Sequence, residues 1–512
     1  MARWTRLTRT RLAAGLAVAA VAGSVLATAT LWHGQRNPIL SQIPAGLMTG
    51  GIFNGIPMQA EGRAYVIDDG VTDRVVTMQG RGGYTWGGSS GNPMLHVIDT
   101  ATGRLLWSVT LNSSAGGGQY VTNLATGRVF AIDPNSQQIT VLDARQGTIL
   151  ASPAWPTDRS GAPLTMTNIN ASLIDPRSDH IFLYMASGSS SWGSSMAPSQ
   201  SQPQVVMMLD GRSGRPLRVL NFPPGPLLNS PGPNGTTFTN YSSTLSLTLD
   251  PRPDRLDIFD ARGRITVVDT VSGRVVRARR LRTAIAGAIM DDRTGRIFGL
   301  DATKDPRVVG GCLTRYGYRF AGGVVMIDAA TGAVLRRLPG GVGLGVGWGG
   351  AWGAALDERT GHLFVANRAG NSLSVVDAVS GRVLRTVAPG AIPLQVASDP
   401  IHRRVLVVTT PRGAFIRPWA PNSTLVVLDA RDGAVLRTIP LGQPAALLAV
   451  DSLTGHLVMD ASSIQPVPTD SWGWMPSAVR SRLPAIPPPP PTLGPSQQVL
   501  HSTVLIVDPS GS

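Results

Sequence analysis

The 512-residue sequence contains a single cysteine, Cys312, and a single lysine, Lys304. One cysteine excludes an intramolecular disulfide framework and any metal or iron–sulfur site that needs several thiolates. Charged residues make up only 15% of the chain, and no stretch after the N-terminal region has the spacing of a long amphipathic helix, which excludes a helical bundle. Glycine (59) and proline (40) are abundant, but their combined share lies below the roughly 25–30% of disordered, low-complexity chains. The composition therefore indicates a folded chain with many turns.

The net charge is +14, and arginine supplies all but one of the 45 basic residues. A strongly basic chain raises the question of nucleic-acid binding. The sequence has no basic helix and no RNA-binding signature, and its scarcity of lysine also argues against such a surface. We therefore expect no nucleic-acid partner.

Residues 1–32 have the pattern of an export segment. Four arginines precede an uncharged stretch of 21 residues, Leu12 to Trp32, which is long enough to span a bilayer. Ala27 and Ala29 fit a small-residue cleavage site, so the segment is compatible both with a signal peptide and with an uncleaved transmembrane signal-anchor. Either one places residues 33–512 outside the cytoplasm, and an uncleaved segment makes the membrane a partner.

The exported part consists of an internal repeat. A short apolar strand, an aspartate, two or three residues, a glycine and a second strand recur eight times, at spacings of 44 to 79 residues. The shortest spacing matches the ~40–45 residues of a four-stranded propeller blade. The repeated aspartates are Asp99, Asp143, Asp210, Asp269, Asp328, Asp377, Asp429 and Asp508.

A second motif precedes each copy, as in the segments that begin at Asp291, Asp357 and Asp451. This motif predicts strand a, a tight turn and strand b, and the aspartate–glycine motif then predicts strand c, a turn and strand d. Aspartate and glycine suit such turns because the carboxylate accepts nearby main-chain N–H groups and glycine tolerates positive φ. Five copies carry an arginine on strand d, four residues after the glycine, and we expect a solvated belt on the outermost strands: Arg218, Arg277, Arg336, Arg385 and Arg437.

The two ends of the chain predict how the repeat closes. The last unit stops after strand c at Asp508, whereas the segment Ile39 to Gly46 resembles a strand d and aligns with Val435 to Gly442. We expect the N-terminal strand to complete the C-terminal blade, because this removes exposed sheet edges. The predicted fold class is all-β: one domain, residues 33–512, that forms an eight-bladed β-propeller of four-stranded antiparallel blades. Seven blades are the alternative if one unit is displaced.

Residues Phe364 to Pro400, FVANRAGNSLSVVDAVSGRVLRTVAPGAIPLQVASDP, resemble the YVTN family of bacterial β-propeller repeats, as does the unit from Leu425 to Asp451. The other units match this WD40-like repeat less closely. The literal tetrapeptide Tyr120 to Asn123 precedes a turn rather than lying in strand b, so we treat it as a coincidence. The resemblance implies a secreted or surface-exposed bacterial propeller, and it brings no catalytic residues.

The unit from His96 to Trp107, HVIDTATGRLLW, is also similar to the repeat of quinoprotein dehydrogenases, which are eight-bladed propellers that bind pyrroloquinoline quinone. Their blades carry tryptophan four residues after the motif glycine. Here Trp107 holds that position once, and five other copies have arginine there. The adjacent cysteine pair found in many members of that family cannot form with one cysteine. We therefore expect no cofactor.

The long insertions fall between strands b and c or between strands d and a, which are the connections at one face of a propeller. The b–c insertions are residues 79–93, 187–203, 304–323, 411–422 and 461–501, of which the last is the largest, and the d–a insertions are residues 222–243 and 340–353. Loops on a rigid scaffold commonly carry recognition, and tryptophan is a favoured anchor. The alternative is that the rings cap the channel or pack loop against loop. The candidate ligand-binding face comprises Trp86, Trp192, Trp348, Trp352, Trp419, Trp472 and Trp474.

The sequence shows no catalytic or metal-ligating set. Repeat register explains His180, His362 and His456, which occupy equivalent positions at the start of strand b, and the motif aspartates are expected to form their own turns. A G-x-S-x-G match at Gly87 and a G-x-G-x-x-G match at Gly345 lie in glycine-rich loops without the following helix that such motifs require. We therefore predict a non-enzymatic binding or scaffold protein that recognises a protein or an envelope polymer. The alternative is a propeller enzyme of lactonase, lyase or quinoprotein type that uses the central channel.

Overall fold

Every regular element in the described part of the computed structural model is a β-strand, from β1 to β36. Within that part, no helix has the length and apolarity needed to cross a bilayer, and the predicted export segment, residues 1–32, lies outside it. The structure describes residues 39–44, 58–60, 63–68, 71–79, 83–90, 94–99, 101–102, 104–110, 119–123, 125–134, 136–158, 160–166, 168–186, 204–223, 227–231, 237–241, 246–250, 254–260, 263–281, 285–301, 323–338, 353–367, 370–411, 423–443, 445–451, 453–464 and 497–510.

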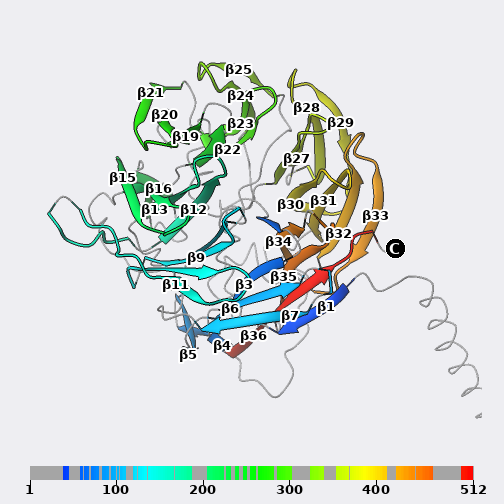
Figure 1. The fold of residues 1–512 in the computed structure, drawn as a ribbon. Coiled ribbons are helices and arrows are strands. Elements are labelled where there is room, and N and C mark those ends of the chain that lie inside the picture. The colour runs from blue at the N-terminus through cyan, green and yellow to red at the C-terminus, as the bar shows by residue number, and fades with distance from the viewer. Residues whose placement is uncertain are drawn as a thin grey trace, which may run out of the picture.

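Six sheets each contain four consecutive antiparallel strands, in the order predicted for strands a, b, c and d. Figure 1 shows these sheets arranged around a common centre, with strands such as β12 and β22 inside and β21 and β25 on the rim. The four-stranded sheets are β8 (Gln119–Asn123), β9 (Arg128–Asp133), β10 (Gln138–Asp143) and β11 (Ile149–Ala151); β12 (Asn168–Asp175), β13 (His180–Ala186), β14 (Gln204–Asp210) and β15 (Pro216–Phe222); β18 (Ser246–Asp250), β19 (Arg255–Phe259), β20 (Arg264–Asp269) and β21 (Val275–Arg280); β22 (Ile285–Asp291), β23 (Arg296–Asp301), β24 (Val324–Asp328) and β25 (Val334–Arg337); β26 (Ala354–Asp357), β27 (His362–Asn367), β28 (Ser372–Asp377) and β29 (Val383–Val387); and β30 (Ile392–Asp399), β31 (Arg404–Thr410), β32 (Thr424–Asp429) and β33 (Val435–Pro440).

A seventh four-stranded blade combines the two ends of the chain. It consists of β34 (Ala445–Asp451), β35 (Leu457–Ile464) and β36 (Gln497–Val507), with β1 (Ile39–Pro44) on its outer side. Ile43 lies opposite Val504 and Pro44 opposite Thr503, just as Ile439 and Pro440 lie opposite the first two residues of β32. The predicted pairing of the N-terminal strand, and its register, are therefore observed.

The first repeat unit forms a three-stranded sheet of β3 (Arg63–Asp68), β6 (Met94–Asp99) and β7 (Leu105–Thr110). The preceding strand, β2 (Met58–Ala60), pairs in parallel with β34 of the seventh blade instead of with β3. The described structure thus contains seven four-stranded blades, while all eight predicted b–c strand pairs are formed.

Strands b and c are apolar because both of their faces are covered by neighbouring sheets. Phe364 and Val376 on β27 and β28, for example, are fully buried, but on opposite faces. Among the described residues, seven clusters of buried side chains each join two successive sheets, from the β3–β6–β7 sheet round to the blade of β34, β35, β36 and β1. Each aliphatic side chain buried in this way contributes about 1.5–3 kcal/mol. The core is therefore a series of inter-blade layers.

The connections have different lengths at the two ends of the blades. We call the end with the a–b and c–d turns the turn end, and the end with the b–c and d–a connections the loop end. The long connections each follow a strand b or a strand d: they run between β13 and β14, β23 and β24, β31 and β32, β35 and β36, β15 and β18, and β25 and β26. One boundary was wrong: β35 and β36 extend into the largest insertion, predicted as 461–501, and leave residues 465–496 between them.

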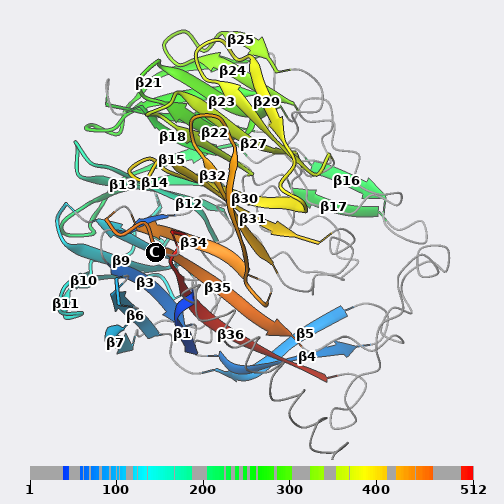
Figure 2. The same cartoon turned by 90° about the vertical axis from the view of Figure 1, so that its right-hand side faces the viewer.

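Two insertions contain strands of their own, which the sequence did not reveal. The connection from β3 to β6 includes β4 (Val71–Gln79) and β5 (Gly83–Ser90), and β4 pairs with residues 497–500 of β36. The connection from β15 to β18 includes the hairpin of β16 (Leu227–Pro231) and β17 (Thr237–Tyr241). Both hairpins project on the same side of the molecule in Figure 2.

Candidate functional site

The motif aspartates close the c–d turns at the turn end. Asp269 accepts hydrogen bonds at Oδ1 from the Ser272 hydroxyl and the Ser272 N–H, both at 2.7 Å, and its main-chain carbonyl accepts the N–H of Gly273 at 2.8 Å. The hydrogen bonds from Ser272 hold the pKa of Asp269 below its usual value. This confirms the prediction that these carboxylates form their own turns. Hydrogen bonds within the turn likewise lower the pKa values of Asp99, Asp143, Asp328 and Asp377.

A second set of aspartates ends strand a and is almost completely buried. Asp357 accepts the N–H of Thr360 in its own a–b turn at 2.9 Å and the hydroxyl of Ser398, from the next blade, at 3.1 Å. These carboxylates therefore stabilise one turn and join it to its neighbour. The other fully buried members are Asp175, Asp291, Asp399 and Asp451.

The histidines at the start of strand b also connect neighbouring blades. His180 and His362 are the first residues of β13 and β27, and His456 directly precedes β35, as repeat register predicted. The Nδ1 atom of His180 lies 2.7 Å from the Thr270 carbonyl oxygen, and that of His362 lies 3.2 Å from the Ala430 carbonyl oxygen. Both carbonyls belong to the c–d turn of the following blade, so these rings hold blades together.

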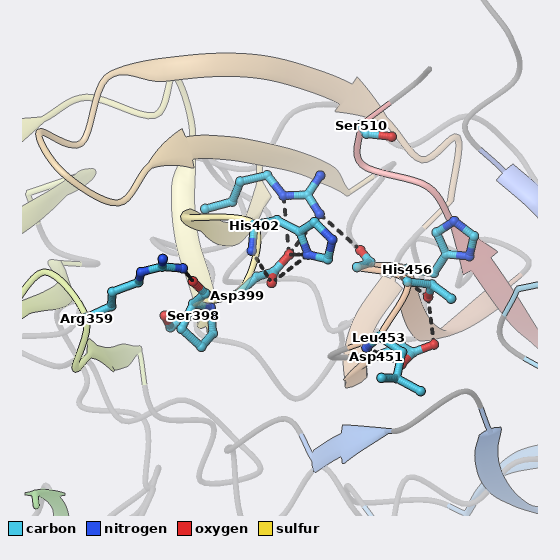
Figure 3. A network of polar contacts seen from close by, with 12 residues as sticks. Arg359, Ser398, Asp399, His402, Asp451, Leu453, His456 and Ser510 are labelled. Atoms are coloured by element: carbon cyan, nitrogen blue, oxygen red, sulfur yellow. Dashed lines mark hydrogen bonds and ion pairs between the residues drawn. The ribbon is translucent and has the colours of Figure 1, made fainter.

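A polar cluster that joins two blades surrounds Asp399, at the end of β30 (Figure 3). The Nη2 atom of Arg404 lies 2.8 Å from Asp399 Oδ2, and His402 Nδ1 lies 3.0 Å from both carboxylate oxygens. Arg404 also donates to the Gly455 carbonyl of the next blade at 3.4 Å. A carboxylate that orients an imidazole resembles part of a catalytic triad. Among the described residues, no hydroxyl or thiol contact to His402 is present. The bond from Arg404 to Gly455 makes the cluster a clamp between blades.

One buried carboxyl was not anticipated. Asp257 lies in the middle of β19 on the same face as Phe259, which packs against the next blade. Burial raises its pKa to about 7; the nearby Arg277 opposes this shift and Asp250 adds to it. The Oδ1 atom of Asp257 is buried and has no hydrogen-bond partner in the described structure. The signal was an acidic residue between apolar Leu256 and Ile258 in a buried strand.

The strand-d arginines do more than form a solvated belt. They lie on the outermost strands, as predicted, but four of the five reach the c–d turn of the next blade. Arg218 donates to the Gly273 carbonyl at 3.0 Å, and Arg336 donates to the Ser380 carbonyl at 2.8 Å. Arg277 donates to the carbonyls of Ala329 and Ala330, and Arg385 to that of Asp432.

In the first unit, Trp107 occupies the strand-d position that arginine holds in these other blades. A Cβ atom on Gly147, in the turn of the next blade, would lie 2.6 Å from the Trp107 ring. The ring therefore packs directly on a glycine that adopts a φ of +71°. Tryptophan in the first unit and arginine in four other blades thus both connect strand d to the c–d turn of the next blade.

The predicted tryptophan face falls mostly outside the described residues. Trp86 lies in β5, whose main chain pairs with β4; Trp192, Trp348, Trp352, Trp419, Trp472 and Trp474 lie outside the described residues. Trp155, in a d–a connection, packs against the adjacent core, and its Nε1 donates to the Leu164 carbonyl at 2.9 Å. Among the described side chains, no group of three or more His, Cys, Asp or Glu is arranged to hold a metal ion.

Comparison with known proteins supports a propeller repeat. A family model described as PQQ_2, outer membrane protein assembly factor BamB, matches residues 17–192. No curated protein matches in sequence.

Three similar solved structures share 10–13% sequence identity with this chain. BamB from Moraxella catarrhalis is 12% identical, with 87% of this chain and 97% of that chain covered and a TM-score of 0.42. The designed protein Ika8 is 13% identical, with 80% and 96% covered and a TM-score of 0.43. Sqt1 from Saccharomyces cerevisiae is 10% identical, with 79% and 96% covered and a TM-score of 0.44. Together with the blade topology, the family-model match shows that this chain is a β-propeller repeat protein.

Proposed function

We propose that this chain is an exported, non-enzymatic β-propeller that binds a protein or an envelope polymer through its loop end. The observation that carries the proposal is the placement of the long insertions, which all connect strand b to c or d to a. The turn end has short turns whose polar groups are bonded to neighbouring blades. Insertions on one side of a rigid scaffold are a common way to build a recognition surface.

The exported location is supported by two features. Residues 1–32 combine four arginines with a long uncharged stretch, and the matching family model is described as that of an outer membrane assembly factor. An assembly factor acts by binding other proteins, which is compatible with a scaffold role. We place the propeller outside the cytoplasm, either secreted or anchored by its N-terminal segment.

We also infer that the ring is closed and has eight units of the YVTN type. The three-stranded first unit packs on the β8–β11 blade through Leu95 and Val129. On its other side, β3 contacts β34, and β2 pairs with β34. The N-terminal segments therefore bridge the last blade and the first unit, as a closed ring requires.

The loop-end proposal is tested with two matched triple variants of the full chain. One replaces Trp419, Trp472 and Trp474 by alanine. The control replaces Val271, Val379 and Leu453 by alanine; these turn-end residues are 58%, 48% and 66% exposed. Both variants should keep the thermal unfolding midpoint of the parent.

The readout is the capture of envelope proteins and polymers on the immobilised chain, quantified by mass spectrometry and glycan analysis. The proposal predicts that the tryptophan variant loses the captured ligand and that the control retains it. If the tryptophan variant retains the captured ligand and the control loses it, the binding surface lies at the turn end and the proposal is wrong.

A further inference from the structure

The outer strand of the β18–β21 blade has an unusual charge. β21 is the terminal strand of its sheet, and residues 274–282 contain five arginines: Arg274, Arg277, Arg279, Arg280 and Arg282. No aspartate or glutamate occurs between residues 270 and 290. Val275 and Val276 are 51% and 53% exposed, and no described strand pairs with the outer edge of β21. It forms part of the rim in Figure 1.

Arg277 and Arg279 bond to the next blade, whereas Arg280 makes no such bond among the described residues. Arg277 and Arg279 donate to main-chain carbonyls in the c–d turn of the next blade, at Ala329, Ala330 and Thr331. Arg280, at the end of β21, is exposed. Its side chain forms no hydrogen bond or ion pair within the part of the chain that the structure describes.

The residue opposite Arg280 is another arginine. Arg264, the first residue of β20, is its cross-strand neighbour and is also exposed. Like charges directly opposite each other in a sheet are destabilising, whereas opposite charges are favourable. Elsewhere in the molecule, arginines at strand ends face aspartates across the sheet. These pairs are Arg128 with Asp143, Arg255 with Asp269, Arg296 with Asp328, and Arg404 with Asp429.

We propose that the open edge of β21 binds an extended acidic segment of a partner protein, which adds to the sheet as a further strand. Carboxylates of the segment would neutralise the Arg264–Arg280 pair, and main-chain hydrogen bonds to β21 would fix its register. The molecule already extends its own sheets in this way: β4 pairs with β36, and β2 pairs with β34. This site uses the edge of β21 and none of the loop tryptophans, so the inference does not rest on the proposed function.

The probe is a fluorescein-labelled decapeptide of alternating glutamate and valine, and its binding to the full chain is followed by fluorescence anisotropy. A saturable signal is expected, and Arg264→Glu with Arg280→Glu should weaken binding at least tenfold. The matched control is Arg382→Glu with Arg431→Glu, which changes the charge equally at exposed arginines of other blades and should alter the affinity less than twofold. Arg280→Gln should give an intermediate loss, and unfolding midpoints verify that each variant is folded.

A second peptide carries N-methyl groups at alternate residues, which block main-chain pairing but leave the charge unchanged. The proposal predicts at least tenfold weaker binding of this peptide. Equal binding of both peptides would overturn strand addition. Absence of saturable binding, equal weakening by the control pair, or binding of inorganic polyphosphate in place of the peptide would overturn the acidic segment as ligand.

Discussion

The two ends of the blades are built in different ways. At the turn end, aspartates, histidines and arginines in short turns bond to their own turn or to the next blade, as Asp357, His362 and Arg404 do. At the loop end, connections range from the tight Asp260 turn to the segment of residues 465–496. The turn end therefore holds the sheets in place, which leaves the loop end free to vary in length and content.

The largest expected effect concerns the clamp around Asp399. Asp399→Ala leaves the Arg404 guanidinium, whose side chain is only 10% exposed, without its carboxylate. Removal of one partner of a buried ion pair typically costs about 3–5 kcal/mol. Urea unfolding should show a loss of this size. The exposed turn residue Asp432, replaced by alanine, should cost less than about 1 kcal/mol; equal losses would show that the Asp399 clamp adds no more stability than an exposed turn.

Asp257 gives a pH-dependent effect of opposite sign to that of the turn aspartates. Its pKa in the folded state is about 7, above its value in the unfolded chain, so the folded state binds the extra proton and stability is lost as the pH rises from about 4 to 7. Asp257→Asn should remove this loss and stabilise the protein at pH 8, by at most about 4 kcal/mol.

The matched variant Asp328→Asn should behave in the opposite way. The pKa of Asp328 is lowered by its bond to Thr331, so the stability that it contributes is present at neutral pH and is lost as the pH falls through its lowered value. Unfolding free energies are measured at pH 3, pH 5 and pH 8: the change from pH 5 to pH 8 reports Asp257, and the change from pH 5 to pH 3 reports Asp328. If Asp257→Asn is less stable than the parent at pH 8, burial does not penalise the charged carboxylate of Asp257 in the way proposed.

Substitutions at two turn-end glycines distinguish the cost of backbone strain from the cost of a steric clash with the neighbouring blade. Gly433 and Gly127 have φ values of +71° and +64°, so both resist substitution. A Cβ on Gly433 would lie 2.8 Å from Val375 of the preceding blade, whereas one on Gly127 meets nothing within 4 Å. We expect Gly433→Val to cost about 3 kcal/mol and Gly127→Val about 1–2 kcal/mol. Equal costs in urea unfolding would show that the blades can move apart at this turn.

The smallest expected effect concerns the arginines on strand d. Arg385→Ala removes one hydrogen bond to the Asp432 carbonyl, at 3.3 Å, from an exposed side chain. Such a bond contributes roughly 0.5–1 kcal/mol. Arg382→Ala, in the same blade, removes an exposed arginine with no described side-chain bond and should have no measurable effect. If both variants are neutral, strand-d docking contributes nothing beyond the solvated belt that the sequence suggested.

The repeat made the regular blades predictable from the sequence, whereas the irregular parts of the fold were not predictable. The aspartate–glycine turns, strands b and c and the register of Ile43 followed from pattern matching between units. The β4–β5 hairpin was missed because its glycine-rich strand, residues 83–90, lacks the apolar alternation of a strand. The pairing of β2 with β34 was also missed, since three residues carry too little pattern to predict a partner.

The side-chain interactions were predictable only where a motif defines its own partners. The Asp269 turn is local, so its hydrogen bonds follow from sequence. The reach of Arg336 to Ser380 joins residues 44 positions apart, and only the spacing between blades brings them together. An acidic residue between apolar neighbours marks Asp257 in the sequence, but the extent of its burial depends on the packing of the next blade.

Photo-crosslinking from both ends of the propeller tests the central claim most directly. A photoreactive amino acid is placed at Trp472 or Trp419 at the loop end, and at Leu453 or Val379 at the turn end, in the full chain within intact cells. The loop-end positions should crosslink to a discrete envelope ligand, while the turn-end positions should not. Crosslinks to the same ligand from Leu453 and Val379, with none from the two tryptophan positions, would contradict the account.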